Sequence, residues 1–157
     1  MKTREEIDAA QIGLTGNSGG GTMTTMLLAA TGAWLGETPF AMAAPSCYIT
    51  TWRCNLENEL PADSEQQPPH ALEYGMEMGD LLMLHAPKPL ILLGQEHDYF
   101  DARGLEDTYE RLKHFWGLFG AEEDLRLYIG PRPHGYHQEN REAMYAFFGE
   151  YTGLDIS

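Results

Sequence analysis

The stretch Ile12-Gly13-Leu14-Thr15-Gly16-Asn17-Ser18-Gly19-Gly20 decides the fold of this chain. Its first four residues form a short apolar run that is typical of a buried strand. Residues 22–30 are rich in Met, Leu and Ala and indicate a helix, with Gly32 near its end. Between them lies G-x-S-x-G, the pattern of a strand–turn–helix unit that carries a serine on a sharp turn. A Gly-rich turn that binds phosphate has a similar sequence, so the pentapeptide could be either a turn that carries a reactive serine or a phosphate-binding turn.

The rest of the chain repeats the alternation of strand and helix. We expect strands at residues 40–49, 89–93 and 125–129, helices at 72–85, 105–119 and 140–151, and a loop rich in Pro and Gln at 57–70. Residues 89–93 are nearly all apolar, which is typical of a strand that is covered on both faces. The order predicts the α/β class: a mostly parallel sheet of about four strands, flanked by helices and joined by right-handed crossovers.

Length and charge narrow the classes of function. The 157 residues, 43% of them hydrophobic, suit one domain covering residues 1–157. Asp and Glu number 24 against 10 Lys and Arg, and the resulting charge of −14 disfavours nucleic acid and anionic membranes as partners. No apolar run approaches the length of a membrane span. The charged start has no apolar stretch behind it, so we expect no signal peptide and a cytoplasmic location.

The cysteines, tryptophans and histidines give no sign of a disulfide framework or a bound cofactor. Cys47 and Cys54 are too few for a framework, and we interpret them as free thiols. Trp34 and Trp52 are expected to be buried. The His, Asp and Glu residues show no spacing typical of metal ligands, so we predict neither a metal nor a cofactor.

Ser18 is the candidate nucleophile. A serine on a strand-to-helix turn projects its hydroxyl from a strained backbone, which needs small neighbours, and we expect Gly16 and Gly20 to supply that space. The N-terminus of the following helix offers positive potential and free N–H groups to a developing oxyanion. Gly19 is therefore the candidate oxyanion donor.

A nucleophilic serine needs a base, and the base needs an orienting acid. The loops after the third and fourth strands lie at the carboxyl ends of strands, where α/β sheets bind ligands. In the third-strand loop we choose Asp98 over Glu96 and Asp101 as the acid. In the fourth-strand loop we favour His134, which lies in a tight Pro-His-Gly turn, over His137 at the approach to the last helix. The other four histidines lack this placement.

Several segments together resemble a known family. They are Gly16-Asn17-Ser18-Gly19-Gly20-Gly21-Thr22, Asp63-Ser64-Glu65-Gln66, Pro87-Lys88-Pro89-Leu90-Ile91-Leu92-Leu93-Gly94-Gln95 with Asp98, His134-Gly135-Tyr136 and Glu142-Ala143-Met144-Tyr145. The chain resembles the acetyl xylan esterase-like branch of the α/β-hydrolase superfamily, related to dienelactone hydrolases and prolyl oligopeptidases. The resemblance implies a serine hydrolase with Ser18 as nucleophile, Asp98 as acid and His134 as base, acting on short acyl esters such as acetyl esters.

The chain departs from that family at its start. Only about eleven residues precede the first expected strand, whereas the family has several strands and an oxyanion loop there. We therefore expect a truncated α/β-hydrolase fold that forms a partial domain. Gly19 is the one oxyanion donor that the sequence identifies. A prolyl oligopeptidase-type peptidase is the alternative enzyme, and a non-catalytic fragment or a subunit that needs a partner is the alternative of another class.

The same departure predicts self-association. The strand at residues 12–15 becomes a sheet edge with no Lys or Pro to block pairing, and bare edges of this kind pair with other chains. We therefore expect a homodimer that binds a small-molecule ester.

Overall fold

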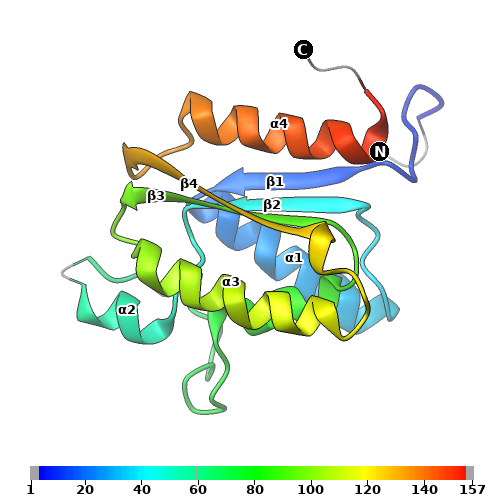
Figure 1. The fold of residues 1–157 in the computed structure, drawn as a ribbon. Helices are drawn as coiled ribbons and strands as arrows, with labels where there is room; N and C mark the ends of the chain where they lie inside the picture. Colours follow the sequence, from blue (N-terminus) through cyan, green and yellow to red (C-terminus); the bar gives the residue numbers. More distant parts are fainter. Residues whose placement is uncertain (1–3, 59, 155–157) are drawn as a thin grey trace.

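The computed structural model describes residues 4–58 and 60–154 and contains one four-stranded parallel sheet between two layers of helices (Figure 1). The strand order is β1-β2-β3-β4, so neighbours in the sequence are neighbours in the sheet. The strands are β1 (Gly13–Asn17), β2 (Met42–Ser46), β3 (Leu90–His97) and β4 (Leu125–Pro133). This confirms the predicted α/β class with four parallel strands.

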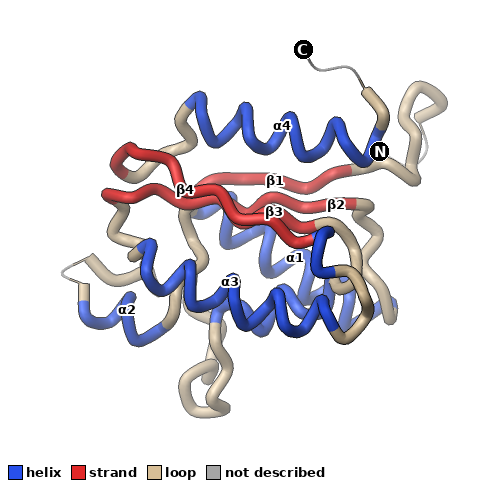
Figure 2. The backbone as a smooth tube through the Cα atoms, viewed as in Figure 1, coloured by secondary structure: helices blue, strands red, loops and turns tan. Residues whose placement is uncertain are grey.

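Helices cover both faces of the sheet. The α-helices are α1 (Gly19–Leu35), α2 (Trp52–Glu57), α3 (Ala102–Gly117) and α4 (Gln138–Thr152), and the 3-10 helices are η1 (Ser64–Gln66), η2 (Met78–His85) and η3 (Glu122–Asp124). Figure 2 shows α4 on one face of the sheet and α1 and α3 on the other. None of the helices in the described part of the chain is long and apolar enough to cross a bilayer.

The alternating side chains of β3 fill two cores. Leu90 and Leu92 belong to the larger core under α1, η2 and α3, while Ile91 and Leu93 belong to the smaller core under α4. All four side chains are almost fully buried. The apolar run at residues 89–93 is therefore a strand covered on both faces, as predicted.

Several sequence predictions need correction. The short helix α2 was not expected, and the helix predicted at residues 72–85 is a 3-10 helix over Met78–His85 only. Both β3 and β4 run past their predicted ends, so residues 94–97 and 130–133 are strand and not loop. Trp34 is 88% exposed, although Trp52 is buried as expected.

Strand β1 forms one edge of the sheet, as the sequence predicts. Its residues are exposed or half-buried, whereas every residue of β2 beside it is buried. The strand that leads into Ser18 thus has one side that no described strand pairs with.

Candidate active site

Ser18 lies on a strained turn between β1 and α1. Its backbone has φ 58° and ψ −118°, a conformation that residues with a side chain rarely adopt. The Ser18 N–H donates to the Ser46 carbonyl at the end of β2 (2.9 Å), and the Ser18 carbonyl accepts the first hydrogen bond of α1 from Thr22 (2.9 Å). The turn is held from both sides, so the strain is maintained by the fold around it.

Glycines supply the space that this turn needs, but they are not the pair that the sequence suggested. A Cβ at Gly16 would collide with the main chain of Gly20, and a Cβ at Gly21 would collide with the Ser46 carbonyl. A Cβ at Gly20 would meet nothing within 4 Å. The close approaches are therefore at Gly16 and Gly21, because Gly20 contributes its backbone and not an empty side-chain position.

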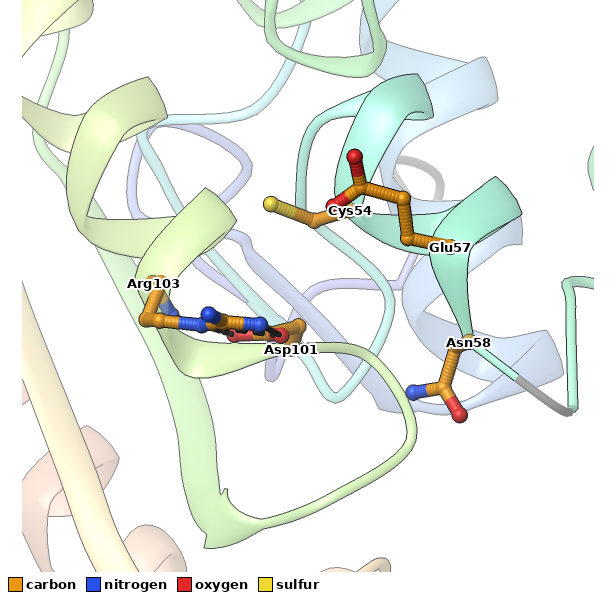
Figure 3. Close-up of a pocket in the computed structure, with 5 residues that line it drawn as sticks. All are labelled: Cys54, Glu57, Asn58, Asp101 and Arg103. Atoms are coloured by element: carbon orange, nitrogen blue, oxygen red, sulfur yellow. Dashed lines mark hydrogen bonds and ion pairs between the residues drawn. The ribbon is translucent and has the colours of Figure 1, made fainter.

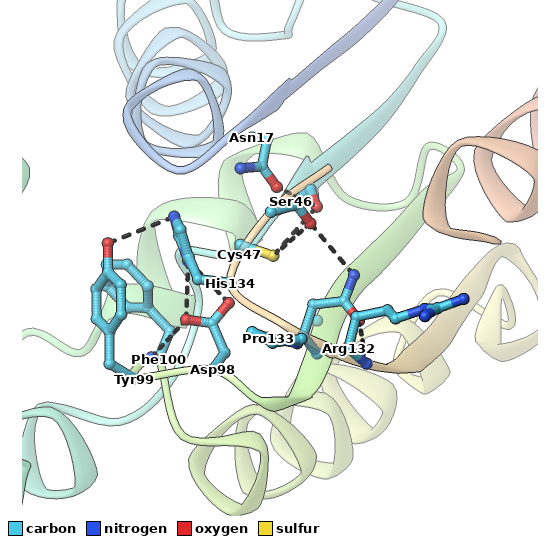
Figure 4. Close-up of polar contacts among 12 residues, drawn as sticks. Asn17, Ser46, Cys47, Asp98, Tyr99, Phe100, Arg132, Pro133 and His134 are labelled. Carbon is cyan, nitrogen blue, oxygen red and sulfur yellow. Dashed lines mark hydrogen bonds and ion pairs between the residues drawn. The ribbon is translucent and has the colours of Figure 1, made fainter. Parts of the chain in front are cut away.

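Asp98 and His134 are brought together at the carboxyl ends of β3 and β4 (Figure 4). The His134 Nδ1 lies 2.8 Å from one Asp98 carboxylate oxygen and 2.9 Å from the other. The Asp98 side chain is fully buried and that of His134 is 25% exposed. Since a carboxylate accepts, Nδ1 carries the proton, and Nε2 presents its lone pair outward as a proton acceptor.

The other candidate acids and bases have different surroundings. Glu96 is exposed, and Asp101 caps α3 by accepting from the Arg103 N–H (2.8 Å). His137 is the residue before α4, and its Nε2 donates to the Pro133 carbonyl (3.1 Å). Within the described residues, Asp98 is the carboxylate that pairs with an imidazole at these strand ends.

Tyr99 stands next to the imidazole, and sequence reasoning missed it. Its hydroxyl lies 3.4 Å from His134 Nε2, and the two rings stack with centroids 4.5 Å apart. Burial raises the pKa of Tyr99, and the nearby Ser18 hydroxyl opposes that shift. No direct hydrogen bond joins Ser18 to His134 in the ranges 4–58 and 60–154. A tyrosine directly after a candidate acid was the only sequence signal for this contact.

A buried amide network holds the histidine loop. Gln95 donates from Nε2 to the Gly135 carbonyl (3.2 Å) and to Asn140 Oδ1 (2.5 Å), and its Oε1 accepts from the Arg132 N–H (3.1 Å). Asn140 in turn donates to the Gly94 carbonyl (3.0 Å). Both amide side chains are fully buried. The network ties β3, the His134 loop and α4 into one unit, which fixes the position of the imidazole.

Cys47 packs beneath the Asp98–His134 pair. Its Sγ lies 3.5 Å from the Gly135 carbonyl, to which it donates, and Cys47 and Cys54 are both free thiols, as predicted. Burial raises the pKa of the Cys47 thiol to about 12. Potential ligand atoms of Cys47, Asp98 and His134 lie within 4.8 Å of one another. A protonated thiol beside a bonded Asp–His pair is a poor donor set for a metal, since metals bind thiolates and free lone pairs.

A polar hollow between α2 and α3 lies behind the acid loop (Figure 3). Asn58 lines it and donates to the Tyr99 carbonyl (2.6 Å), while Asp101 and Arg103 on its other side form an ion pair. These bonds fix the loop that carries Asp98 and Tyr99 at its far end.

Comparison with known proteins gives structural matches alone. No protein-family model and no curated protein sequence matches this chain. The chain is similar to the methylesterase BT1017 (TM-score 0.76, 24% identity, covering 99% of this chain and 33% of that one). It is also similar to a family 15 carbohydrate esterase, a glucuronoyl esterase from Caldicellulosiruptor kristjansonii (0.76, 15%, 97% and 46%), and to the glucuronoyl esterase catalytic domain from Hypocrea jecorina (0.73, 16%, 95% and 46%).

These likenesses establish an α/β-hydrolase-like fold. The chain spans between a third and just under half of the length of the solved structures it matches. These three neighbours bear the names of methyl and glucuronoyl esterases, so the acetyl xylan esterase and dienelactone hydrolase branch is not confirmed by them.

Proposed function

We propose that this chain carries the catalytic residues of a serine-dependent carboxylic-ester hydrolase, with Ser18 as nucleophile, His134 as base and Asp98 as acid. The observation that supports this most is the Asp98–His134 pair, joined at 2.8 and 2.9 Å, at the same sheet end as a serine with φ 58°. A strained serine beside an oriented imidazole is the arrangement that activates a hydroxyl for acyl transfer.

The reaction proceeds in two steps through an acyl-enzyme. His134 Nε2 receives the proton of the Ser18 hydroxyl as Oγ attacks the ester carbonyl, and it then gives this proton to the departing alcohol. Water attacks the acyl-serine in the second step, again with His134 as base, and the free acid leaves. Asp98 keeps the proton on Nδ1 and stabilises the transient imidazolium, because its carboxylate is buried and hydrogen-bonded to that nitrogen.

Gly19 supplies one oxyanion donor. It is the first residue of α1, so its N–H has no acceptor within the helix and lies where the helix dipole is positive. A tetrahedral oxyanion is normally held by two donors, and each is worth about two to three orders of magnitude in rate.

Two observations bear on the substrate class, and they favour different esters. The resemblance in sequence favours short acyl esters such as acetyl esters, whereas the structural neighbours bear the names of glucuronoyl and methyl esterases. Both are carboxylic esters, and the proposed triad serves either. The acyl side therefore distinguishes them: a two-carbon group in one case and a uronic acid in the other.

We further propose that the chain works as a symmetric dimer through β1 and α1. The free edge of β1 is continuous in sequence with a helix of 17 residues that contains no charged side chain. Along α1, Met23 is 55% exposed, Leu27 37% and Trp34 88%, positions that repeat as one helical stripe. A two-fold axis through the edge pairs β1 with its copy and brings the two stripes to the same side.

A steady-state assay tests the proposed activity. The protein is offered p-nitrophenyl acetate and methyl glucuronate, with Ser18→Ala as the blank. Turnover of either substrate that is lost in Ser18→Ala supports the proposal and names the acyl class. Equal rates for the wild type and Ser18→Ala on both substrates would overturn it.

A further inference from the structure

A buried glutamine is linked by hydrogen bonds to the main chain of the proposed nucleophile. Gln66 belongs to η1 and lies 44 residues from Thr22 in the sequence, and its Nε2 donates to the Thr22 hydroxyl (3.0 Å). The Thr22 hydroxyl in turn donates to the Ser18 carbonyl (3.2 Å), which also accepts from the Thr22 N–H (2.9 Å). Both Gln66 and Thr22 are 3% exposed. A buried chain of hydrogen bonds therefore runs from η1 to Ser18.

The direction of each hydrogen bond in this chain is fixed by its neighbours. The Gln66 Oε1 accepts from the Asp63 N–H (3.0 Å), so Nε2 is the end of the amide that faces Thr22. An amide nitrogen only donates, so the Thr22 hydroxyl accepts from Gln66 and uses its own hydrogen for the Ser18 carbonyl. The Gln66 main-chain carbonyl accepts from the buried Tyr48 hydroxyl (2.8 Å), which ties η1 to the larger core.

Thr22 differs from the next two threonines of α1. The hydroxyls of Thr24 and Thr25 also donate to the carbonyl four residues earlier in the helix. Among residues 4–58 and 60–154, a side chain from outside the helix donates to Thr22, but none donates to Thr24 or Thr25. The contact with Gln66 is thus made at the threonine that bonds to Ser18.

The Ser18 carbonyl and the Gly19 N–H belong to one peptide unit. This unit is planar and trans, so its C=O and N–H point in opposite directions. Thr22 holds the carbonyl along α1 with two hydrogen bonds, which directs the Gly19 N–H away from the helix. Donors to a peptide carbonyl also polarise the unit and make its N–H a stronger donor. Both the direction and the strength of the proposed oxyanion donor therefore depend on what the Ser18 carbonyl accepts.

We propose that Gln66 is a positioning residue of the hydrolase, which acts through Thr22 to orient the Ser18–Gly19 peptide and to aim the Gly19 N–H at the oxyanion. This proposal rests on the proposed hydrolase function. The hydrogen bond from Gln66 fixes the rotation of the Thr22 hydroxyl, which would otherwise be free to turn away from the Ser18 carbonyl. The strained backbone of Ser18 needs such support, because an unfavourable conformation persists only where its surroundings hold it.

Gln66→Met removes the donor and keeps the length of the side chain. We expect kcat for p-nitrophenyl acetate to fall about 10-fold with KM nearly unchanged, which is part of the two to three orders of magnitude that one oxyanion donor contributes. Gln67→Met is the matched control. It makes the same substitution at the next residue, whose Nε2 donates to the Ala62 carbonyl (2.8 Å) and not to Thr22, and it should leave kcat unchanged.

A thionoester separates the positioning of the oxyanion donor from a general loss of packing. Sulfur accepts hydrogen bonds more weakly than oxygen, so p-nitrophenyl thionoacetate gains less from the Gly19 N–H than p-nitrophenyl acetate does. The ratio of kcat for the ester to kcat for the thionoester should therefore be several-fold lower in Gln66→Met than in the wild type and Gln67→Met. A purely structural role of Gln66 lowers both rates together, so an unchanged ratio would overturn the proposal.

Substitutions of Thr22 test whether Gln66 acts through this residue, and they do so even if Gln66→Met fails to fold. Thr22→Val removes the hydroxyl and should lower kcat and the ratio at least as much as Gln66→Met does. Thr22→Ser keeps a hydroxyl and should retain both wild-type values. In the Thr22→Val background, Gln66→Met should cause no further loss, because the chain is already broken. Additive losses, or a Thr22→Val variant with the wild-type ratio, would overturn the proposed path.

The amide resonance of Gly19 separates a failure of this proposal from a failure of the proposed function. The amide nitrogen chemical shift of Gly19 responds to hydrogen bonding at the Ser18 carbonyl, so it should move in Gln66→Met and stay in place in Gln67→Met. Ser18-dependent turnover together with an unmoved Gly19 resonance in Gln66→Met would overturn the positioning role alone. A wild type with neither ester turnover nor fluorophosphonate labelling of Ser18 would overturn the proposed function and the positioning role together.

Discussion

Ser18 shows how single residues prepare this site before any substrate arrives. A φ of 58° costs a residue with a side chain on the order of 1–3 kcal/mol, and the surrounding contacts have to offset it. The Ser46 carbonyl does so by accepting the Ser18 N–H, and Gly21 lets this carbonyl approach α1 closely. The nucleophile is thus positioned by backbone groups that belong to strand β2 and helix α1.

The first prediction compares two neighbouring glycines. Gly21→Ala places a Cβ against the Ser46 carbonyl and near Tyr48, so we expect the free energy of unfolding to drop by about 1–3 kcal/mol. Gly20→Ala adds a methyl group in open space at the start of a helix and should be neutral or stabilising by up to about 1 kcal/mol. Urea unfolding curves measure both. Equal losses for the two variants would contradict the close approach at Gly21.

At the scale of elements, local sequence patterns predict strands with a regular side-chain period, but they do not predict contacts between residues that lie far apart in the sequence. The alternation at residues 125–129 and the apolar run at 89–93 are enough to predict β4 and β3, because burial on a sheet follows the side-chain period. The sharp turn at Ser18, followed by two later strand ends, is likewise sufficient to bring Asp98 and His134 into one region.

Other parts of the site could not be predicted from the sequence. Tyr99 contacts His134 from a loop that Asn58 holds through a hydrogen bond across 41 residues, and neither contact leaves a local pattern in the sequence. Gln95 and Asn140 are ordinary polar residues in sequence, and their role depends on full burial between β3 and α4. Trp34 is exposed although its residue type favours burial, because no element in the described part of the chain packs over its side chain.

The second prediction concerns η2 and its junction with β3. His85, at the end of η2, is buried, its Nε2 donates to the Pro89 carbonyl (3.2 Å), and its Nδ1 accepts from the Thr38 hydroxyl (2.7 Å). Burial lowers the pKa of His85 from 6.5 to about 4, so the folded state keeps this ring neutral. Between these two values the unfolded chain binds a proton that the folded chain does not. His85 therefore costs stability as pH falls from 6.5 toward 4, by up to about 3 kcal/mol.

The loss of stability attributed to His85 is checked by measuring the free energy of unfolding at pH 7 and at pH 4. The wild type should lose about 3 kcal/mol more between the two pH values than His85→Gln does. His114→Gln, which changes an exposed histidine on α3, should behave as the wild type. A pH 4 loss that is the same in His85→Gln and the wild type would contradict the buried neutral ring.

At the scale of the whole molecule, the sheet ends at β1, whose outer edge pairs with no described strand. The chain covers 33 to 46% of the length of its structural neighbours, and β1 is an edge strand followed by an uncharged helix. The net charge of −14 opposes self-association, but charges farther apart than about 10 Å are largely screened at 0.1 M salt. Apolar burial at short range then decides the outcome.

The third prediction is the assembly state. Light scattering behind a sizing column should give twice the chain mass of 17.6 kDa at micromolar concentration. Met23→Glu places a charge on the exposed stripe of α1 and should shift the protein to the monomer, whereas Leu118→Glu, which is 69% exposed beyond α3, should leave the dimer intact. A wild-type monomer with full esterase activity at nanomolar concentration would refute the assembly.

The central claim is that Ser18 is a nucleophile activated by the His134–Asp98 pair, and covalent labelling tests it most directly. The protein is treated with a fluorophosphonate, and the modified peptide is identified by mass spectrometry. We predict a single phosphonyl adduct on Ser18, with labelling slowed by several orders of magnitude in His134→Ala and left nearly unchanged in His137→Ala, because the members of a triad act as a unit. An adduct on another serine, or equally fast labelling of Ser18 in His134→Ala, would contradict the account.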